Sequence, residues 1–319
     1  MQSRNKIKLF FNPEDYELSS ELIVALCLPE SFVSKSNNSL LQTDNRFRTT
    51  KGFCKKYFTW CDDIKVCDFV LYPRKFTDSH NPLFNRYLSL AKKHYKKLLG
   101  FQIDDSWKSN GFDDDLILYK TSIDKSNKGI NVRSMPAFIE DKFDYTFQHG
   151  DRKPSLGFCG HQQNGRHVFL TALRYSEFKT NFIIREGFWA PEIHDRKKAA
   201  RDFDNNIRSN LFNFCHKGAG NFSYRFYEVM MHCRLPFIIN THCMFPFSDR
   251  WKLGDIGFVF EGTDTILMLS DYKNYLKSKF SDFLRQQVTN RNIFESFFSP
   301  DGFLFNLYLD LKTDIQKYG

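Results

Sequence analysis

A short segment from Leu211 to Glu228 orders glycine, cationic and acidic side chains in a way that suits a phosphate ligand. It reads Leu-Phe-Asn-Phe-Cys-His-Lys-Gly-Ala-Gly-Asn-Phe-Ser-Tyr-Arg-Phe-Tyr-Glu. Small residues let a backbone approach an anion closely, and the N–H groups at a helix start favour negative charge. We therefore predict a diphosphate site, in which a turn at Gly218 and Gly220 leads into a helix that Ser223 caps.

The charged side chains around this turn match the parts of a nucleoside diphosphate. Lys217 and Arg225 would supply positive charge to the phosphates, and the carboxylate of Glu228 would accept the hydroxyls of a ribose. A lone Gly-x-Gly is a weak signal, because such glycines often only turn the chain. The order Lys217, Ser223, Arg225, Glu228 favours binding over the alternative, a surface pair of Arg225 and Glu228 that binds nothing.

The elements that position this segment alternate between short apolar runs and helical stretches. In the first half these are Ile7–Phe11, Ser20–Leu26, Asp68–Tyr72, Pro82–Lys97, Leu98–Ile103 and Leu116–Tyr119. In the second half the strands are Leu156–Cys159, Asn181–Ile184, Leu211–Cys215, Pro236–Asn240 and Gly257–Phe260, with helices at Arg166–Tyr175, Asp195–Asn206, Tyr272–Arg285 and Leu304–Gln316. Such alternation indicates parallel sheets between helices.

The fold class that follows is α/β, with two halves of similar size, a cleft between them and a helical C-terminus. The polar stretch Asp144–Pro154 is the expected connection, which gives a first domain over residues 1–150 and a second over 151–319. Parallel sheets bind ligands at the carboxyl ends of their strands, so the chemistry is expected in strand-to-helix loops.

Composition narrows the class of protein. The chain has 319 residues, 41% of them hydrophobic, which excludes a disordered chain, and no apolar run approaches the ~20 residues that span a bilayer. The start from Met1 to Lys8 lacks the apolar stretch of a signal peptide. With 46 Lys and Arg against 37 Asp and Glu, the formal charge of +9 suits an anionic partner. We expect a cytoplasmic protein without a transmembrane segment.

The eight cysteines contain no C-x-x-C pair and are interpreted as free thiols. A zinc site formed by Cys54, Cys61, Cys67 and His80 is conceivable, but the spacing fits no usual ligand pattern.

The segment also resembles the donor-site signature of the exostosin family of glycosyltransferases. In that signature a small-residue turn leads into Ser-x-Arg-x-x-Glu, then a strand that begins with a hydrophobic residue and Pro, then a loop that ends in Pro-Phe. The matching residues here are Ser223-Tyr-Arg225-Phe-Tyr-Glu228, Leu235-Pro236-Phe-Ile-Ile239 and Pro246-Phe247. The run Pro154 to Gly160, with Arg166 after it, resembles the family's Phe-x-Gly strand and downstream Arg.

The resemblance covers most of the chain, specifically from Phe214 to Phe247 and loosely before Pro154, with weaker similarity at Asp68–Pro73 and Val132–Pro136. It implies two facing Rossmann-like domains (the GT-B type), with the nucleotide sugar held by the second and the acceptor mainly by the first. It also implies an inverting transfer of a sugar from a nucleotide-diphosphate donor, UDP-linked in preference to GDP-linked, to a glycan acceptor, as in polysaccharide biosynthesis. No cofactor is required, because the nucleotide sugar is a substrate.

Carried over by residue, the resemblance places Arg166, Lys217 and Arg225 at the diphosphate, Ser223 at the turn and Glu228 at the ribose. Two departures matter. Many cellular relatives carry an amino-terminal membrane anchor and a lumenal stem, which we do not expect in this chain, so their substrates are not assumed. Lys217 stands where Arg is common, which keeps the charge but loses the bidentate fork.

A catalytic base is expected in the first domain, since an inverting transfer must deprotonate the acceptor hydroxyl. Asp104 and Asp105 follow the apolar run Leu98–Ile103 and are the candidates, with a turn or cap role as the alternative. The run from Asp113 to Asp115 resembles an Asp-x-Asp metal site but is interpreted as a solvated turn, and no metal is expected.

Three histidines of the second half, His161, His216 and His242, are interpreted as loop or packing residues. Trp189 would either stack on a sugar or base or lie in the core. Two other functions stay open: a basic, aromatic nucleic-acid-binding protein, for which no RNA-binding motif is present, and a non-catalytic relative of the transferase fold.

Overall fold

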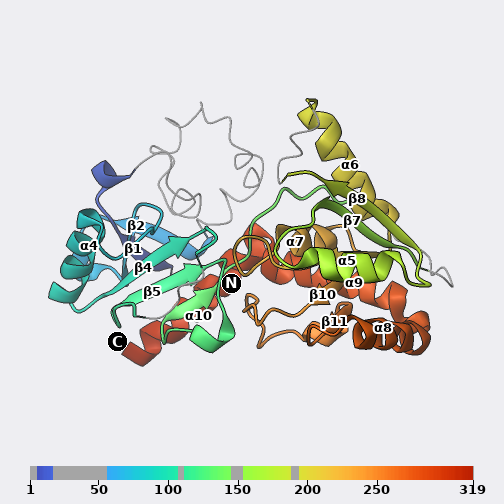
Figure 1. Ribbon diagram of the computed structural model, residues 1–319. Coiled ribbons are helices and arrows are strands. Elements are labelled where there is room, and N and C mark those ends of the chain that lie inside the picture. The colour runs from blue at the N-terminus through green and yellow to red at the C-terminus, as the bar shows by residue number, and fades with distance from the viewer. Residues whose placement is uncertain (1–5, 17–55, 107–110, 145–153, 188–193, 319) are drawn as a thin grey trace. The chain divides into compact units, whose positions relative to one another are not determined.

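A computed structural model describes residues 6–16, 56–106, 111–144, 154–187 and 194–318 (Figure 1). The chain forms two compact units, each with its own parallel sheet. The first unit comprises Met1–Glu140, Met244–Phe247 and Ser296–Gly319, and the second comprises Asp141–Cys243 and Ser248–Glu295. The expected α/β class with two Rossmann-like halves is confirmed, and the predicted cleft stays a prediction.

The sheet of the first unit is six-stranded and parallel, in the order β2-β1-β3-β4-β5-β6. Its strands are β1 (Ile7–Phe10), β2 (Phe58–Cys61), β3 (Phe69–Leu71), β4 (Lys97–Gln102), β5 (Leu116–Lys120) and β6 (Val132–Ser134). Short 3₁₀ turns lie at Pro13–Asp15, Ile64–Val66 and Lys125–Asn127. The strands β3, β4 and β5 are buried along their length except Lys97, as apolar runs in a parallel sheet predict.

Helix α4 (Pro82–Lys93) begins where the sequence supplies both a cap and a proline. The Asn81 Oδ1 accepts hydrogen bonds from the N–H groups of Leu83 (2.9 Å) and Phe84 (3.3 Å), and Pro82 occupies the first turn. The helix buries Phe84, Tyr87 and Ala91, which recur at the spacing of one helical face.

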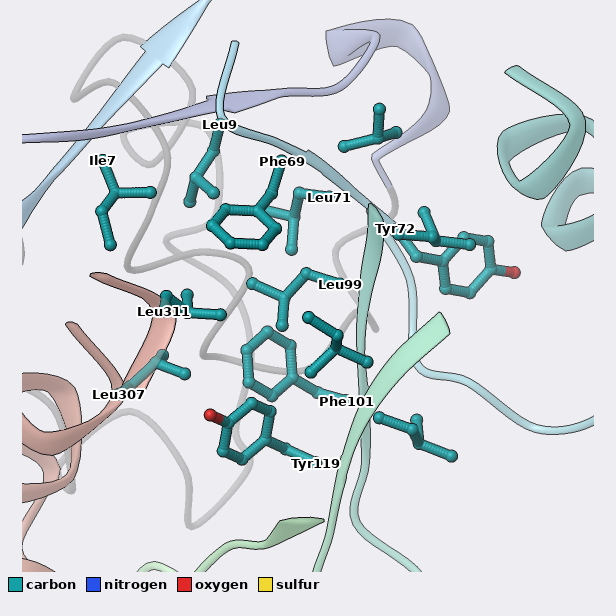
Figure 2. Close-up of a cluster of buried hydrophobic side chains, with 14 of the residues drawn as sticks. Ile7, Leu9, Phe69, Leu71, Tyr72, Leu99, Phe101, Tyr119, Leu307 and Leu311 are labelled. Carbon is teal, nitrogen blue, oxygen red and sulfur yellow. The ribbon is translucent and has the colours of Figure 1, made fainter. Parts of the chain in front are cut away.

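The last helix, α10 (Pro300–Tyr318), packs on the first sheet although it ends the chain. Its Leu307 and Leu311 point toward Leu99 and Tyr119 in the core (Figure 2). A buried ion pair adds to this contact, since Arg133 Nη2 of β6 lies 2.7 Å from an Asp314 carboxylate oxygen.

This packing corrects the expected division of the chain at residue 150, in which the terminal helices belonged to the second half. The apolar stripe of a helix predicts that it docks, but not on which sheet. The units divide at Glu140 and Asp141, and the C-terminal helix returns to the first. Most of the expected connection, residues 145–153, lies outside the described residues.

The sheet of the second unit is five-stranded and parallel, in the order β11-β10-β9-β7-β8. Its strands are β7 (Leu156–His161), β8 (Thr180–Arg185), β9 (Phe212–Cys215), β10 (Leu235–Ile239) and β11 (Phe258–Phe260). The helices are α5 (Arg166–Arg174), α6 (Arg196–Ser209), α7 (Tyr224–Met231), α8 (Thr265–Lys279) and α9 (Phe283–Ile293), with short 3₁₀ turns at Leu253–Asp255 and Phe280–Asp282. A π-helix at Phe294–Phe298 follows α9 where the chain passes to the first unit. Helices α5 and α8 pack on the sheet through one aromatic core.

Both sheets share one strand order once each is numbered from its own first strand, namely 2-1-3-4-5, with a sixth strand at the end in the first unit. In such a doubly wound sheet the direction of winding reverses between strands 1 and 3, and ligands bind beside this switch point at the carboxyl ends of the strands. In the second unit the switch point lies between β7 and β9. Among the described helices, none combines the length and the apolar character needed to cross a bilayer.

Candidate anion-binding site

Arg166 is the first residue of α5 and reaches across the switch point of the second sheet. Its Nη1 donates to the His161 carbonyl at the end of β7 (3.0 Å), and its Nη2 donates to the carbonyls of Lys217 (2.8 Å) and His216 (3.3 Å) after β9. Burial, together with the nearby charge of Arg225, lowers the pKa of Arg166 to about 10, so the side chain remains a cation at neutral pH.

Arg225 comes from α7 and reaches the same edge of the sheet. Its Cζ lies 4.2 Å from the centre of the Phe158 ring and 5.2 Å from that of Phe203, and its Nη2 donates to the carbonyl of Cys159 on β7. Burial lowers its pKa, which the nearby carboxylate of Glu228 partly offsets. Two aromatic rings and a carbonyl therefore fix this cation above β7.

Neither guanidinium has an acidic partner in the described part of the chain. Arg166 and Arg225 bind only carbonyls and rings, and the buried Nε of each has no hydrogen-bond partner. The exposed ammonium of Lys217 likewise forms no ion pair among the described residues. Clustered cations without a counter-ion repel one another, so the site is ready for an anion.

The loop between β9 and α7 forms the expected turn. The Gly218 N–H donates to the Phe222 carbonyl (2.8 Å), which closes the loop, and Gly220 is buried within it. A methyl group at Gly218 would meet its nearest atoms at ordinary contact distances, 3.6 Å or more. The turn at Gly218 is thus confirmed, while the expectation that only a small residue fits there is not supported by the space around it.

Ser223 and Glu228 lie where the sequence predicts, at the start and one turn into α7. Ser223 is the N-cap residue, with an extended backbone, but its hydroxyl makes no capping hydrogen bond, which corrects the predicted capping role of the side chain. Glu228 is partly buried and close enough to Arg225 to affect its pKa, yet no ion pair joins them. The two side chains therefore do not form the simple surface ion pair of the alternative, while ligand binding at this turn and the ribose role of Glu228 stay predictions.

His216 belongs to the same site, although the sequence suggested only a loop or packing role. It follows β9 directly, is 7% exposed, and its ring lies nearly parallel to that of Phe214 (9° between planes, centroids 6.3 Å apart). Its buried Nδ1 has no hydrogen-bond partner. Burial and the charge of Arg166 lower the pKa of His216 to about 4, so the imidazole is neutral at physiological pH.

Gly160, the glycine of the Phe-x-Gly run, lies close to the guanidinium of Arg225. Its φ is +153°, and a Cβ there would lie 2.9 Å from the Nη2 of Arg225. A side chain at this position would displace the guanidinium from the Cys159 carbonyl. The second half of the Phe-x-Gly run therefore has a steric purpose that spacing alone does not reveal.

Asp104 and Asp105 follow β4 in the first unit, as predicted. The Asp104 carboxylate accepts hydrogen bonds from Gln102 Nε2 (2.9 Å) and the Ser106 N–H (2.9 Å), while Thr121 Oγ1 donates to its carbonyl (3.3 Å). This is an ordered turn, and the role of either aspartate as a base stays a prediction. The first sheet's own switch point lies between β1 and β3, where Glu14 and Asp15 follow β1.

Two of the three aspartates that follow Gly111 and Phe112 form ion pairs with lysines. Lys92 Nζ lies 2.5 Å from Asp113 Oδ2, and Lys97 Nζ lies 2.7 Å from Asp115 Oδ1. These contacts support the interpretation of a surface turn. In the described ranges no group of three or more His, Cys, Asp or Glu side chains is arranged to hold a metal ion, and all six described cysteines are free. Cys54 and Trp189 lie outside the described residues.

Comparisons with known proteins show similarity of structure, but none of sequence. The chain is similar to a glycosyltransferase from Rickettsia africae ESF-5, with 11% identity, a TM-score of 0.46, and coverage of 99% of this chain and 100% of that one. It is also similar to TarM (9% identity, TM-score 0.41, 68% of this chain and 50% of that one) and to the GtfA/B complex (9%, 0.44, 77% and 57%). No protein-family model and no curated protein matches the sequence. Likenesses this distant carry no inference about activity.

Proposed function

We propose that this chain is a glycosyltransferase. Its second unit binds a sugar linked to a nucleoside diphosphate, with UDP preferred to GDP. The observation that carries the proposal is the pair Arg166 and Arg225, two cations beside the switch point of a parallel sheet with no acidic partner among the described residues. A diphosphate supplies the missing negative charge and accepts hydrogen bonds from guanidinium groups.

The exostosin-like order of residues extends this proposal from an anion to a nucleotide. Arg166, Lys217 and Arg225 would bind the two phosphates, and Glu228 would accept the ribose hydroxyls. The imidazole of His216, the residue before Lys217, is neutral at physiological pH, so it adds no charge at the proposed phosphate site.

The transfer that we propose is a single displacement with inversion. The carboxylate of Asp104 or Asp105 takes the proton of an acceptor hydroxyl, whose oxygen then bonds to the anomeric carbon of the sugar. The bond from that carbon to the diphosphate oxygen breaks, and its electron pair leaves with the diphosphate. The cations of the second unit stabilise this developing charge, which is why we propose that no metal is needed.

A panel of nucleoside diphosphates tests donor binding directly. Thermal unfolding is measured with UDP, GDP, ADP and CDP and with the matching nucleosides, because a ligand at 100 times its dissociation constant stabilises a protein by about 2.7 kcal/mol. We expect UDP to raise the melting temperature most and uridine to raise it little. UDP release from a UDP-sugar panel then tests turnover. No stabilisation by any diphosphate contradicts the proposal.

A further inference from the structure

A second hollow in the second unit lies between the edge strand β8 and helix α6, and we call it the α6 pocket. Its volume is about 510 Å³, within the range of roughly 300–1,000 Å³ typical of small-ligand sites. It is lined by Asn181, Ile183, Asp202, Asn205, Asn206, Arg208, Ser209 and Arg234. None of these residues belongs to the candidate anion-binding site.

The acidic and basic side chains of the α6 pocket are already paired. Asp202 accepts from Arg185 Nη2 of β8 (2.9 Å), and Arg208 forms ion pairs with Asp144 and with Asp204 (3.6 Å for the latter). In contrast to Arg166 and Arg225, these cations have carboxylate partners. An anion would have to compete with those carboxylates, so the pocket does not favour one.

Arg234 is held by backbone carbonyls rather than presented to a ligand. It is 2% exposed, and its Nε and Nη2 both donate to the Arg208 carbonyl (3.0 and 2.8 Å), while its Nη1 donates to that of His232 (3.0 Å). Because it is almost fully buried, the Arg234 guanidinium is closed to a ligand in the pocket, which distinguishes it from the partly exposed Arg166 and Arg225.

Side-chain amides provide the remaining polar groups. Asn206 is 3% exposed and donates from Nδ2 to the Asn181 carbonyl (2.9 Å), but its buried Oδ1 has no partner. The amides of Asn181 and Asn205 are exposed and make no hydrogen bond from their side chains among the described residues. Ile183 supplies an apolar patch between them.

This lining matches the chemistry of a sugar. Each exposed amide offers both donors and acceptors, as neighbouring hydroxyl groups do, so Asn181 and Asn205 can donate to or accept from a sugar hydroxyl. Among the described residues, no aromatic ring lines the pocket, so they provide no platform for stacking a nucleobase. We propose that the α6 pocket is a binding site for a neutral mono- or disaccharide, separate from the donor site.

Saturation-transfer NMR on the full chain tests this proposal with nucleotide-free sugars. The probes are glucose, galactose, mannose, N-acetylglucosamine and cellobiose, with inorganic sulfate as the anionic competitor. The variants are Asn181→Leu and Asn205→Leu, both at exposed positions where folding is not at risk, and Asn274→Leu on the exposed face of α8 is the matched control.

We expect at least one sugar to bind saturably and the double variant Asn181→Leu with Asn205→Leu to weaken it roughly 10-fold, from the loss of one or two hydrogen bonds. The control should bind like the parent. Absence of saturable binding, an unchanged affinity in the double variant, or displacement of the sugar by sulfate overturns the proposal.

A further arm separates this site from the proposed donor site. Sugar binding should be unaffected by Arg225→Lys, and UDP binding should be unaffected by Asn205→Leu. If Arg225→Lys abolishes sugar binding, the sugar occupies the anion-binding site and the α6 pocket proposal is wrong. If UDP fails to bind but the sugar still does, the donor proposal fails while the pocket stands.

Discussion

The guanidinium of Arg225 lies 4.2 Å from the centre of the Phe158 ring, so a cation from α7 rests on an aromatic side chain of β7. The two residues belong to different elements of the second unit, and the contact holds Arg225 at the edge of the sheet where β7 and β9 diverge. A ring neutralises no charge, which leaves this cation available to an anion.

Replacing Gly160 tests how closely Arg225 must be held. In Gly160→Ala the added methyl group would lie 2.9 Å from Arg225 Nη2 at a φ of +153°, so we expect the guanidinium to move. Affinity for UDP should fall about 10-fold, the equivalent of one charge-assisted hydrogen bond, and affinity for uridine should fall less. Calorimetric titration measures both.

The matched control is Gly254→Ala, because no atom lies within 4 Å of a Cβ at that position and it belongs to the same unit. Equal losses of UDP affinity in both variants, or none in Gly160→Ala, would show that the close approach is irrelevant to binding.

A pH dependence of stability follows from His216. Its pKa is lowered to about 4 in the folded protein, while the unfolded chain titrates near 6.5, so between these values the unfolded state binds more protons. The free energy of unfolding should therefore fall as pH drops from about 6.5 to 4, by roughly 3 kcal/mol at most from this residue. Urea unfolding of His216→Asn should lack this part of the decline.

Carboxylates also titrate in that range, so the comparison is between variants. His167→Asn, at an exposed position of α5, serves as the control and should retain the full acid sensitivity of the parent. If the free energy of unfolding of His216→Asn falls with pH as steeply as that of the control, the buried ring of His216 is not the source of the acid sensitivity.

Most strands of both sheets were predictable because they are continuous apolar runs, but the two edge strands of the first sheet, β2 and β6, were not. Strand β6 comprises only Val132–Ser134 and includes a charged side chain. It is therefore defined by its backbone pairing with β5, and not by a pattern of apolar residues in the sequence. Strand β2 is likewise a short edge strand, paired on one side only.

The candidate anion-binding site was also predictable only in part. The positions of Gly218 in a strand-to-helix loop and of Arg166 and Arg225 in the first turns of helices follow from chain order, because a parallel sheet brings such segments to one edge. The contact of Arg225 with Phe158 and the burial of His216 depend on side chains distant in the sequence, which spacing does not encode. The choice of the sheet on which α10 packs likewise depends on contacts between residues that are distant in the sequence.

Metal independence is a further expected outcome. The proposed chemistry places cationic side chains at the diphosphate, and Asp113 and Asp115 are each paired with a lysine. UDP release from the donor should therefore proceed unchanged in excess EDTA. Loss of turnover in chelator that Mn²⁺ restores would make the aspartates ligands and contradict the proposed charge stabilisation.

The catalytic base is tested by isosteric replacement in the first unit. If Asp104 or Asp105 takes the acceptor proton, one of Asp104→Asn and Asp105→Asn should lower kcat about 10²-fold or more and leave UDP affinity nearly unchanged. Steady-state turnover and UDP titration are measured on the same preparations. Normal turnover in both variants would direct the search to Glu14, which is exposed after β1, whereas Asp15 is paired with Arg86.

The central claim is that Arg225 and Glu228 bind different parts of one nucleotide, and calorimetric titration with UDP and with uridine tests it most directly. Arg225→Lys keeps the charge but loses the fork, and should weaken UDP roughly 10-fold while changing uridine little. Glu228→Gln should weaken both ligands by similar factors, and Arg174→Lys, at an exposed position of α5, should weaken neither. Parent-like UDP affinity in both Arg225→Lys and Glu228→Gln would contradict the assignment of this site.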